Sequence, residues 1–98
     1  MILVRDIFQL KFGKAREAVA LWKGMMPGLI AAGHSPSRLL TDITGPYYTL
    51  VLESTFANLA EFENGHGSTS MSAEFRASYE KFVPLVESGR REVFTIVS

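Results

Sequence analysis

Asp6 is the residue whose place in the sequence points most directly to chemistry. It falls on the apolar side of an alternating segment over residues 2–11, beside Val4 and Phe8, so we expect it on the helix-covered face of a strand. A carboxylate in that position must be paired, hydrogen-bonded or protonated. Asp6 is therefore a candidate general acid or base. The alternative is a structural carboxylate held by an arginine or a tyrosine, or one that a bulge turns outward.

His66 is the second candidate for proton transfer. It lies between two glycines in the polar segment 64–70, which predicts an irregular loop long enough to move over a pocket. An imidazole exchanges protons near neutral pH, so Asp6 and His66 form the candidate catalytic pair. The alternative for His66 is a solvent-exposed loop residue. The two histidines lie far apart in the sequence and cysteine is absent, so we expect no metal site.

Several large apolar side chains are candidates for binding a flat apolar ligand. Aromatic rings and the thioether of methionine suit such a ligand, and internal prolines at 27 and 84 loosen the two longer predicted helices. The candidate substrate-binding residues are Trp22, Met26, Tyr48, Phe75 and Tyr79. Their largely helical spacing is equally compatible with ordinary core packing, which is the alternative.

Length and composition limit the possible partners. The 98 residues, 47% of them hydrophobic, predict a single domain over residues 1–98. Ten basic residues balance ten acidic ones, so no net charge attracts nucleic acid or an anionic membrane. The first apolar run contains Arg5 and Asp6, so it predicts neither a signal peptide nor a membrane span. Because the sequence contains no cysteine, it favours a cytoplasmic protein. Separately, we expect no cofactor.

The elements that must position these residues follow from periodicity and from glycine and proline. Alternation predicts strands over residues 2–11, 38–44, 47–56 and 91–97. Helical spacing predicts long helices over residues 14–32 and 71–88, and a short helix that follows Thr55 and ends at about residue 63. Gly89 is expected to end the last helix. The order β-α-β-β-α-β predicts an α+β ferredoxin-like sandwich, in which a four-stranded antiparallel sheet carries the helices on one face.

The other face of that sheet would be uncovered in a single copy. It would carry Leu3, Arg5, Ile7, Tyr47, Thr49, Val51 and Glu53, a set too apolar to remain in water and too polar for a monomeric core. We therefore expect a homodimer, in which two such faces pack together and the two sheets form a barrel. Arg5 and Glu53 are expected to pair on that face.

Two stretches carry a resemblance to known proteins. Residues 8–14, Phe-Gln-Leu-Lys-Phe-Gly-Lys, resemble the strand end Leu-Lys-Pro-Gly-Lys that precedes a long helix, and residues 50–62 resemble an apolar strand followed by Glu, Ser and a short helix. With the element order, the chain resembles the dimeric α/β-barrel superfamily, and within it the NIPSNAP-like and antibiotic-biosynthesis-monooxygenase-like groups. The resemblance implies a fold and a dimer. Haem-degrading relatives place a tryptophan in the second helical region, whereas Trp22 is on the first, so haem chemistry is not carried over.

Two functions follow as expectations. The first is a cofactor-independent enzyme of the monooxygenase or isomerase type that acts on a planar aromatic or hydrophobic metabolite bound between helices and sheet. The second is a non-catalytic dimeric module that binds a hydrophobic small molecule or serves as an assembly scaffold. The fold alone does not distinguish the two, because this architecture carries many functions.

Overall fold

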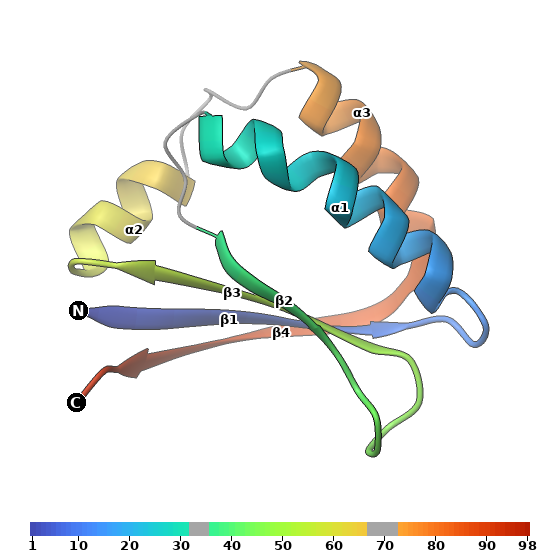
Figure 1. The fold of residues 1–98 in the computed structure, drawn as a ribbon, viewed down its shortest axis with the longest axis horizontal. Helices are drawn as coiled ribbons and strands as arrows, with labels where there is room; N and C mark the ends of the chain where they lie inside the picture. The colour runs from blue at the N-terminus through green and yellow to red at the C-terminus, as the bar shows by residue number, and fades with distance from the viewer. Residues whose placement is uncertain (32–35, 67–72) are drawn as a thin grey trace.

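A curved sheet covered on one side by helices makes up the part of the chain that the structure describes (Figure 1). The computed structural model describes residues 1–31, 36–66 and 73–98, with only the backbone of residues 31, 36, 37, 65 and 66. The elements are β1 (Ile2–Leu10), α1 (Ala15–Ala31), β2 (Pro36–Thr41), β3 (Thr49–Phe56), α2 (Leu59–His66), α3 (Ala73–Phe82), the 3-10 turn η1 (Val83–Leu85) and β4 (Val86–Thr95).

The strands form one four-stranded sheet in the order β2-β3-β1-β4. Every neighbouring pair is antiparallel, and β1 lies in the interior between β3 and β4. All three helices lie on the same side of this sheet (Figure 1). The predicted α+β ferredoxin-like architecture is therefore confirmed.

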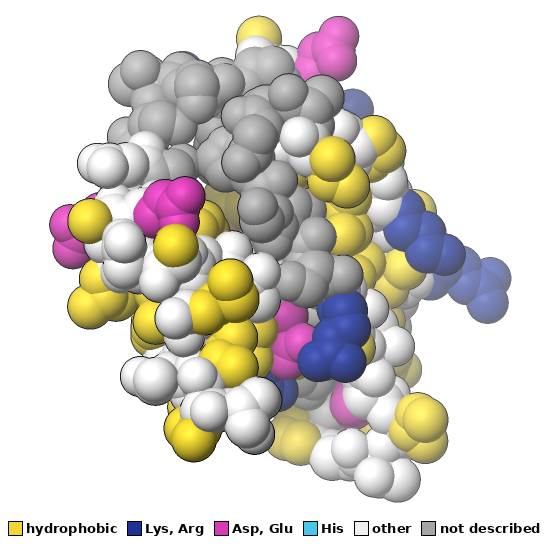
Figure 2. All heavy atoms as spheres, turned by 60° about the vertical axis from the view of Figure 1, so that its left-hand side comes forward, with side chains coloured by type: hydrophobic (Ala, Val, Ile, Leu, Met, Phe, Trp, Pro, Cys, Tyr) yellow, Lys and Arg dark blue, Asp and Glu magenta, His cyan; other side chains and the backbone are white. Residues whose placement is uncertain are grey.

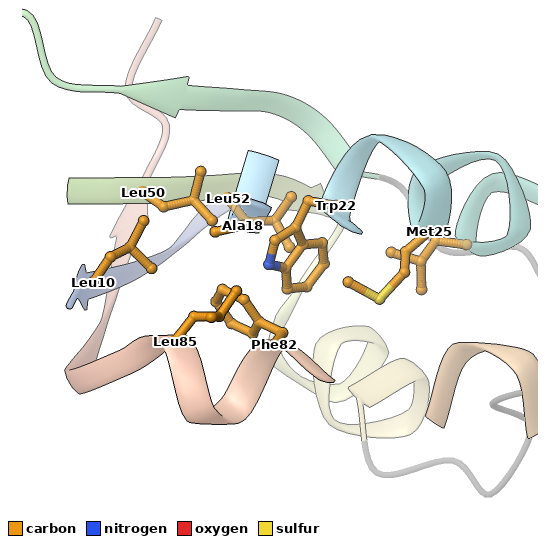
Figure 3. Packing of buried hydrophobic residues seen from close by; sticks show 9 residues of the cluster. Leu10, Ala18, Trp22, Met25, Leu50, Leu52, Phe82 and Leu85 are labelled. Atoms are coloured by element: carbon orange, nitrogen blue, oxygen red, sulfur yellow. The ribbon is translucent and has the colours of Figure 1, made fainter. Parts of the chain in front are cut away.

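The helix-covered face forms the hydrophobic core. Buried positions in α1 recur three and four residues apart, at Ala18, Trp22, Met25 and Leu29, which places them on one stripe of the helix. This stripe packs on alternate strand residues, on the end of α3 and on η1; these are Leu10, Leu50, Leu52, Phe82 and Leu85 (Figure 3). The apolar residues at helical spacing in α1 and the alternate apolar residues of the strands therefore pack in one core layer. This packing determines which face of each element is buried.

The opposite, open face is more buried within one protomer than we expected. We expected Ile7 and Val51 to be buried only in contact with a second copy. Within one protomer they are already buried, with exposed fractions of 6% and 8%. They lie on the two inner strands, where neighbouring strands flank them on both sides. Glu53 is 4% exposed on the same face, and Arg5 Nε lies 3.2 Å from its Oε2, so the predicted Arg5–Glu53 pair is confirmed.

The predicted end of the last long helix is wrong. We expected a helix over residues 71–88, ended by Gly89, and a strand over residues 91–97. Instead α3 ends at Phe82, η1 contains Pro84, and β4 begins at Val86. Proline lacks a backbone donor and clashes with the preceding turn, so it ends the helix instead of kinking it. Gly89 is a strand residue opposite Phe8.

The predicted start of the central strand is also wrong. We expected a strand over residues 47–56, but β3 begins at Thr49 because Tyr48 has a φ of 59°, which breaks the extended backbone. Tyr47 is therefore not part of the open sheet face; it is 74% exposed and contacts the ring of Phe12, with 5.9 Å between centroids. Similarly, β2 covers residues 36–41, and residues 42–44 belong to the turn region.

The polar segment after α2 is only partly described. We expected residues 64–70 to be a loop and the short helix to end near residue 63, but α2 continues to His66. Asn58 explains where α2 begins, because its Oδ1 accepts a hydrogen bond from Glu61 N at 2.9 Å. Glu61 Oε2 in turn accepts one from Ala57 N at 2.8 Å. Residues 67–70 of the predicted loop lie outside the described residues.

We predict that Gly89→Val destabilises the fold by about 2 kcal/mol, because overpacking a fitted core has that typical cost. A Cβ at residue 89 would lie 3.3 Å from Phe8 Cδ1 and 3.5 Å from the Ile7 carbonyl oxygen, so a branched side chain has no space. Urea unfolding monitored by Trp22 fluorescence measures the change.

The matched control is Gly24→Ala in α1, where a Cβ would meet no atom within 4 Å. Alanine in a helix interior should stabilise the protein by about 0.5–1 kcal/mol. Equal effects at residues 89 and 24 would contradict the close approach of β4 to Phe8.

Candidate functional site

Asp6 lies on the helix-covered side of β1, as predicted, and is already paired. In the register of β1 and β4 it faces Arg91, and Arg91 Nε lies 2.6 Å from Asp6 Oδ1. The Asp6 side chain is 14% exposed, so the arginine supplies the charged partner that a largely buried carboxylate requires. The arrangement matches the structural alternative for Asp6.

The short helix α2 places an aromatic ring beside this ion pair. The Arg91 guanidinium lies 5.4 Å from the centroid of the Phe62 ring, a cation–π distance. Phe62 is held in turn by Phe56 at the end of β3, with 5.3 Å between ring centroids. Figure 2 views the molecule from the side of α2 and the two chain ends, where basic and acidic side chains lie against one another among hydrophobic ones.

His66 is the last residue of α2, and its side chain lies outside the described residues. The pairing of Asp6 with His66 as an acid and a base therefore remains a prediction. Within the described ranges, no three histidine, aspartate or glutamate side chains gather closely enough to hold a metal ion.

Three of the predicted binding residues come together in an aromatic cluster. Trp22 of α1 meets Phe75 and Tyr79 of α3, with 6.3 Å between ring centroids in both cases. Two rings that we did not single out complete it: Phe8 lies 6.2 Å from Trp22, and Phe82 lies 5.4 Å from it. We call these five residues the aromatic cluster. It joins α1, α3 and β1 directly above the sheet.

The indole nitrogen of Trp22 has no acceptor among the described residues. Trp22 is 3% exposed, and its Nε1 is buried without a hydrogen-bond partner. Figure 3 shows this nitrogen on the side of the ring that faces Ala18 and Phe82, away from Met25. A buried tryptophan N–H usually finds a partner, and leaving it unpaired costs about 1–3 kcal/mol. Trp22 therefore presents an unused donor inside an apolar layer.

The remaining two predicted binding residues lie elsewhere. Met26 is only partly buried, and it is its neighbour Met25 that belongs to the core. Tyr48 packs on the core from the β2–β3 turn and contacts Phe12, with 4.7 Å between ring centroids. A left-handed backbone is uncommon for a tyrosine, and such strain is often found at functional positions. Tyr48 thus belongs to a second aromatic group, with Phe12 and Tyr47, at the Leu10 end of β1.

Arg91 and Phe8 are the site residues that periodicity alone did not reveal. Phe8 was assigned to the apolar side of the first strand but not to a ligand site. Arg91 was placed at the start of a strand, five residues after the point where β4 begins, so its register against Asp6 was not visible.

The fold is shared with several solved structures, although no family model and no curated protein matches the sequence. A NIPSNAP domain protein from Burkholderia xenovorans superposes with a TM-score of 0.87 at 13% identity, over 100% of this chain and 96% of that one. A NIPSNAP family protein from Agrobacterium tumefaciens strain C58 gives 0.83 at 18% identity, over 96% and 90%. An antibiotic biosynthesis monooxygenase gives 0.74 at 12% identity, over 100% of both chains. At these identities the comparison confirms the expected resemblance at the level of the fold.

Among the described residues, no helix has both the length and the apolar character needed to cross a membrane.

We predict a coupling free energy of about 1 kcal/mol between Asp6 and Arg91, because a partly exposed ion pair contributes no more than that. A double-mutant cycle with Asp6→Asn, Arg91→Gln and the double variant isolates this term from the other contacts of each residue. Urea unfolding in 50 mM and 1 M NaCl measures it, and the coupling should fall in high salt. Additive effects of the two substitutions would show that the pair contributes nothing to stability.

Proposed function

We propose that this protein binds a planar aromatic or hydrophobic metabolite between its helices and its sheet and acts on it without a cofactor, as a monooxygenase- or isomerase-like enzyme. The observation that supports this most is the buried N–H of Trp22 inside the aromatic cluster, which has no acceptor in the described part of the chain. A flat ring would stack among the aromatic side chains, and an oxygen on that ring would accept the hydrogen bond. The ligand class is therefore a ring that carries a carbonyl or phenolic oxygen.

The charged pair beside the cluster provides for proton transfer. On the helix-covered face of β1, Asp6 lies two residues from Phe8, about 7 Å along the strand. Removing a proton from a carbon next to a carbonyl leaves negative charge on the oxygen, and the Trp22 N–H would stabilise that charge. Asp6 would accept the proton, while Arg91 holds its carboxylate in place. His66, at the end of α2, is the proposed second proton-transfer group.

The proposed enzyme works as a homodimer in the cytoplasm. The open face of the sheet carries a row of charged side chains and the half-exposed Phe94, which faces Leu3 across β1 and β4. A second copy would cover both. Proteins with this fold include one whose name is antibiotic biosynthesis monooxygenase, which supports the enzyme class. The lack of cysteine fits a reducing compartment.

A second candidate function is a non-catalytic dimeric module that binds a hydrophobic small molecule or serves as an assembly scaffold. The observation that favours it is the close contact of Asp6 with Arg91, which already occupies one oxygen of the carboxylate. Such a pair stabilises a sheet without performing chemistry. The two candidates differ in whether Asp6 affects turnover.

We predict that ring compounds with a carbonyl oxygen raise the melting temperature of the protein in a thermal-shift screen of aromatic metabolites, quinones and haem. Binding to the folded state at a hundredfold excess over Kd adds about 2.7 kcal/mol. Trp22→Phe removes the N–H donor, so affinity for the carbonyl compound should fall by about tenfold, as expected for one hydrogen bond. Affinity for the same ring without the oxygen should change little.

Met25→Leu is the matched control, because it keeps a similar volume in the same core cluster and leaves Trp22 in place. If no probe stabilises the protein, the ligand proposal is wrong. With a ligand identified, loss of turnover in Asp6→Asn without loss of binding supports the enzyme. Binding without any turnover in the unmodified protein supports the module.

A further inference from the structure

The helix side of the sheet carries one pair of opposite charges at the edge of the aromatic cluster. Among the strand residues in register with one another in the described sheet, Asp6 and Arg91 are the only charged ones on this side. Phe8, a member of the aromatic cluster, lies two residues along β1 from Asp6, and it faces Gly89, two residues along β4 from Arg91. Arg91 therefore lies next to the proposed ligand site.

Arg91 is the more exposed half of this pair. Its side chain is 42% exposed, whereas that of Asp6 is 14% exposed. The rest of β4 is also open to solvent on the helix side, since Gly89 is exposed and Val93 is 43% exposed. On β1, by contrast, Val4, which faces Val93, is fully buried. A ligand on the helix side can therefore approach Arg91 over β4.

Two contacts hold the guanidinium of Arg91 in one orientation. Its Nε lies 2.6 Å from Asp6 Oδ1, and the guanidinium lies 5.4 Å from the centroid of the Phe62 ring. Phe62 is itself held by Phe56, with 5.3 Å between ring centroids. A guanidinium carries five N–H donors in a planar fork that matches a carboxylate. Because its orientation is already fixed, it loses little side-chain entropy when an anion binds.

We propose that Arg91 binds the carboxylate of an aromatic acid, so that the ligand of the site has a polar group at each end. This rests on the function proposed above and specifies its ligand. The ring oxygen accepts the hydrogen bond of the Trp22 N–H, and the acid group meets Arg91. Phe8 lies between these two ends, because its ring is 6.2 Å from that of Trp22 and its neighbour on the same side of β1 is Asp6. Asp6 thus lies beside the middle of the ligand.

The negative charge of Asp6 gives this proposal a signature. In the free protein Asp6 balances the charge of Arg91. The ligand carboxylate competes with Asp6 for the same cation and is repelled by it, so Arg91 favours the acid and Asp6 opposes it. If the pair were only structural, the two substitutions would act in the same direction, because loss of either partner breaks the same contact.

Isothermal titration calorimetry with para-hydroxybenzoate and para-hydroxycinnamate, each beside its methyl ester, tests the proposal. The two acids differ in length, and each ester keeps the ring and the hydroxyl but lacks the charge. We expect at least one acid to bind about tenfold more tightly than its ester, as for a charge-assisted hydrogen bond. Arg91→Gln should remove this preference. Asp6→Asn should increase it by about threefold, because it removes the repulsion.

Arg90→Gln is the matched control. It removes the same charge from the next residue of β4, which faces Ile7 on the opposite side of the sheet and pairs with Glu92 at 3.6 Å. The preference for the acid should be unchanged in this variant. If Arg91→Gln does not fold, Arg91→Lys keeps the charge without the planar fork and should lower the preference.

Three results would overturn the role of Arg91: equal binding of each acid and its ester, equal effects of Arg90→Gln and Arg91→Gln, or a weaker preference for the acid in Asp6→Asn. If the esters bind as well as the acids, the function proposed above still stands, since it requires only the ring and its oxygen. If neither acids nor esters bind, this inference is wrong, and the thermal-shift screen with its wider range of rings decides the proposed function.

Discussion

The buried carboxylate of Glu53 is the interaction on which the arrangement of the sheet depends. A charge so far from water is tolerated only because Arg38 and Arg5, on the two neighbouring strands, both reach it. Shifting either strand by one residue would turn the partner to the other face and leave Glu53 unpaired. The same register directs Leu50 and Leu52 to the helices. The two ion pairs of Glu53 on the open face thus favour the register that directs the core side chains to the other face.

The helix side meets a different physical demand. Its core is closed by an aromatic cluster in which rings meet mostly edge to face, the arrangement that the ring quadrupoles favour. The rings of this layer contact one another closely, but none of the described residues offers the Trp22 N–H a hydrogen-bond acceptor. Asp6 and Arg91, one step further along the sheet, satisfy each other instead. The strand register therefore brings this ion pair together, and the Phe62 ring of α2 lies against its guanidinium.

Much of this organisation could be predicted from the sequence, because it depends on periodicity. Alternation identified both faces of β1 and the pairing of Arg5 with Glu53. Helical spacing placed Trp22 on the buried side of α1, but it selected Met26, whereas the core contains the neighbouring Met25. The errors arose where two local signals competed. Apolar residues at helical spacing continue past Pro84, so the last strand was predicted to begin at residue 91 instead of Val86. The pairing of Arg91 with Asp6 was therefore not predicted. The left-handed backbone of Tyr48 has no signal in composition, since only the surrounding turn imposes it.

The central position of β1 has a consequence for how the chain reaches its native state. Ile2 pairs with Phe56 on one side and with Thr95 on the other, so β1 completes its hydrogen bonds only when β4, the last of the four strands along the chain, is in place. Contacts so distant in sequence slow folding, because a long loop must close before they form. A nascent chain whose β4 has not yet emerged from the ribosome exposes one whole edge of β1. Productive folding therefore waits until β4 has emerged, and loss of β4 would leave an edge of β1 open to aggregation.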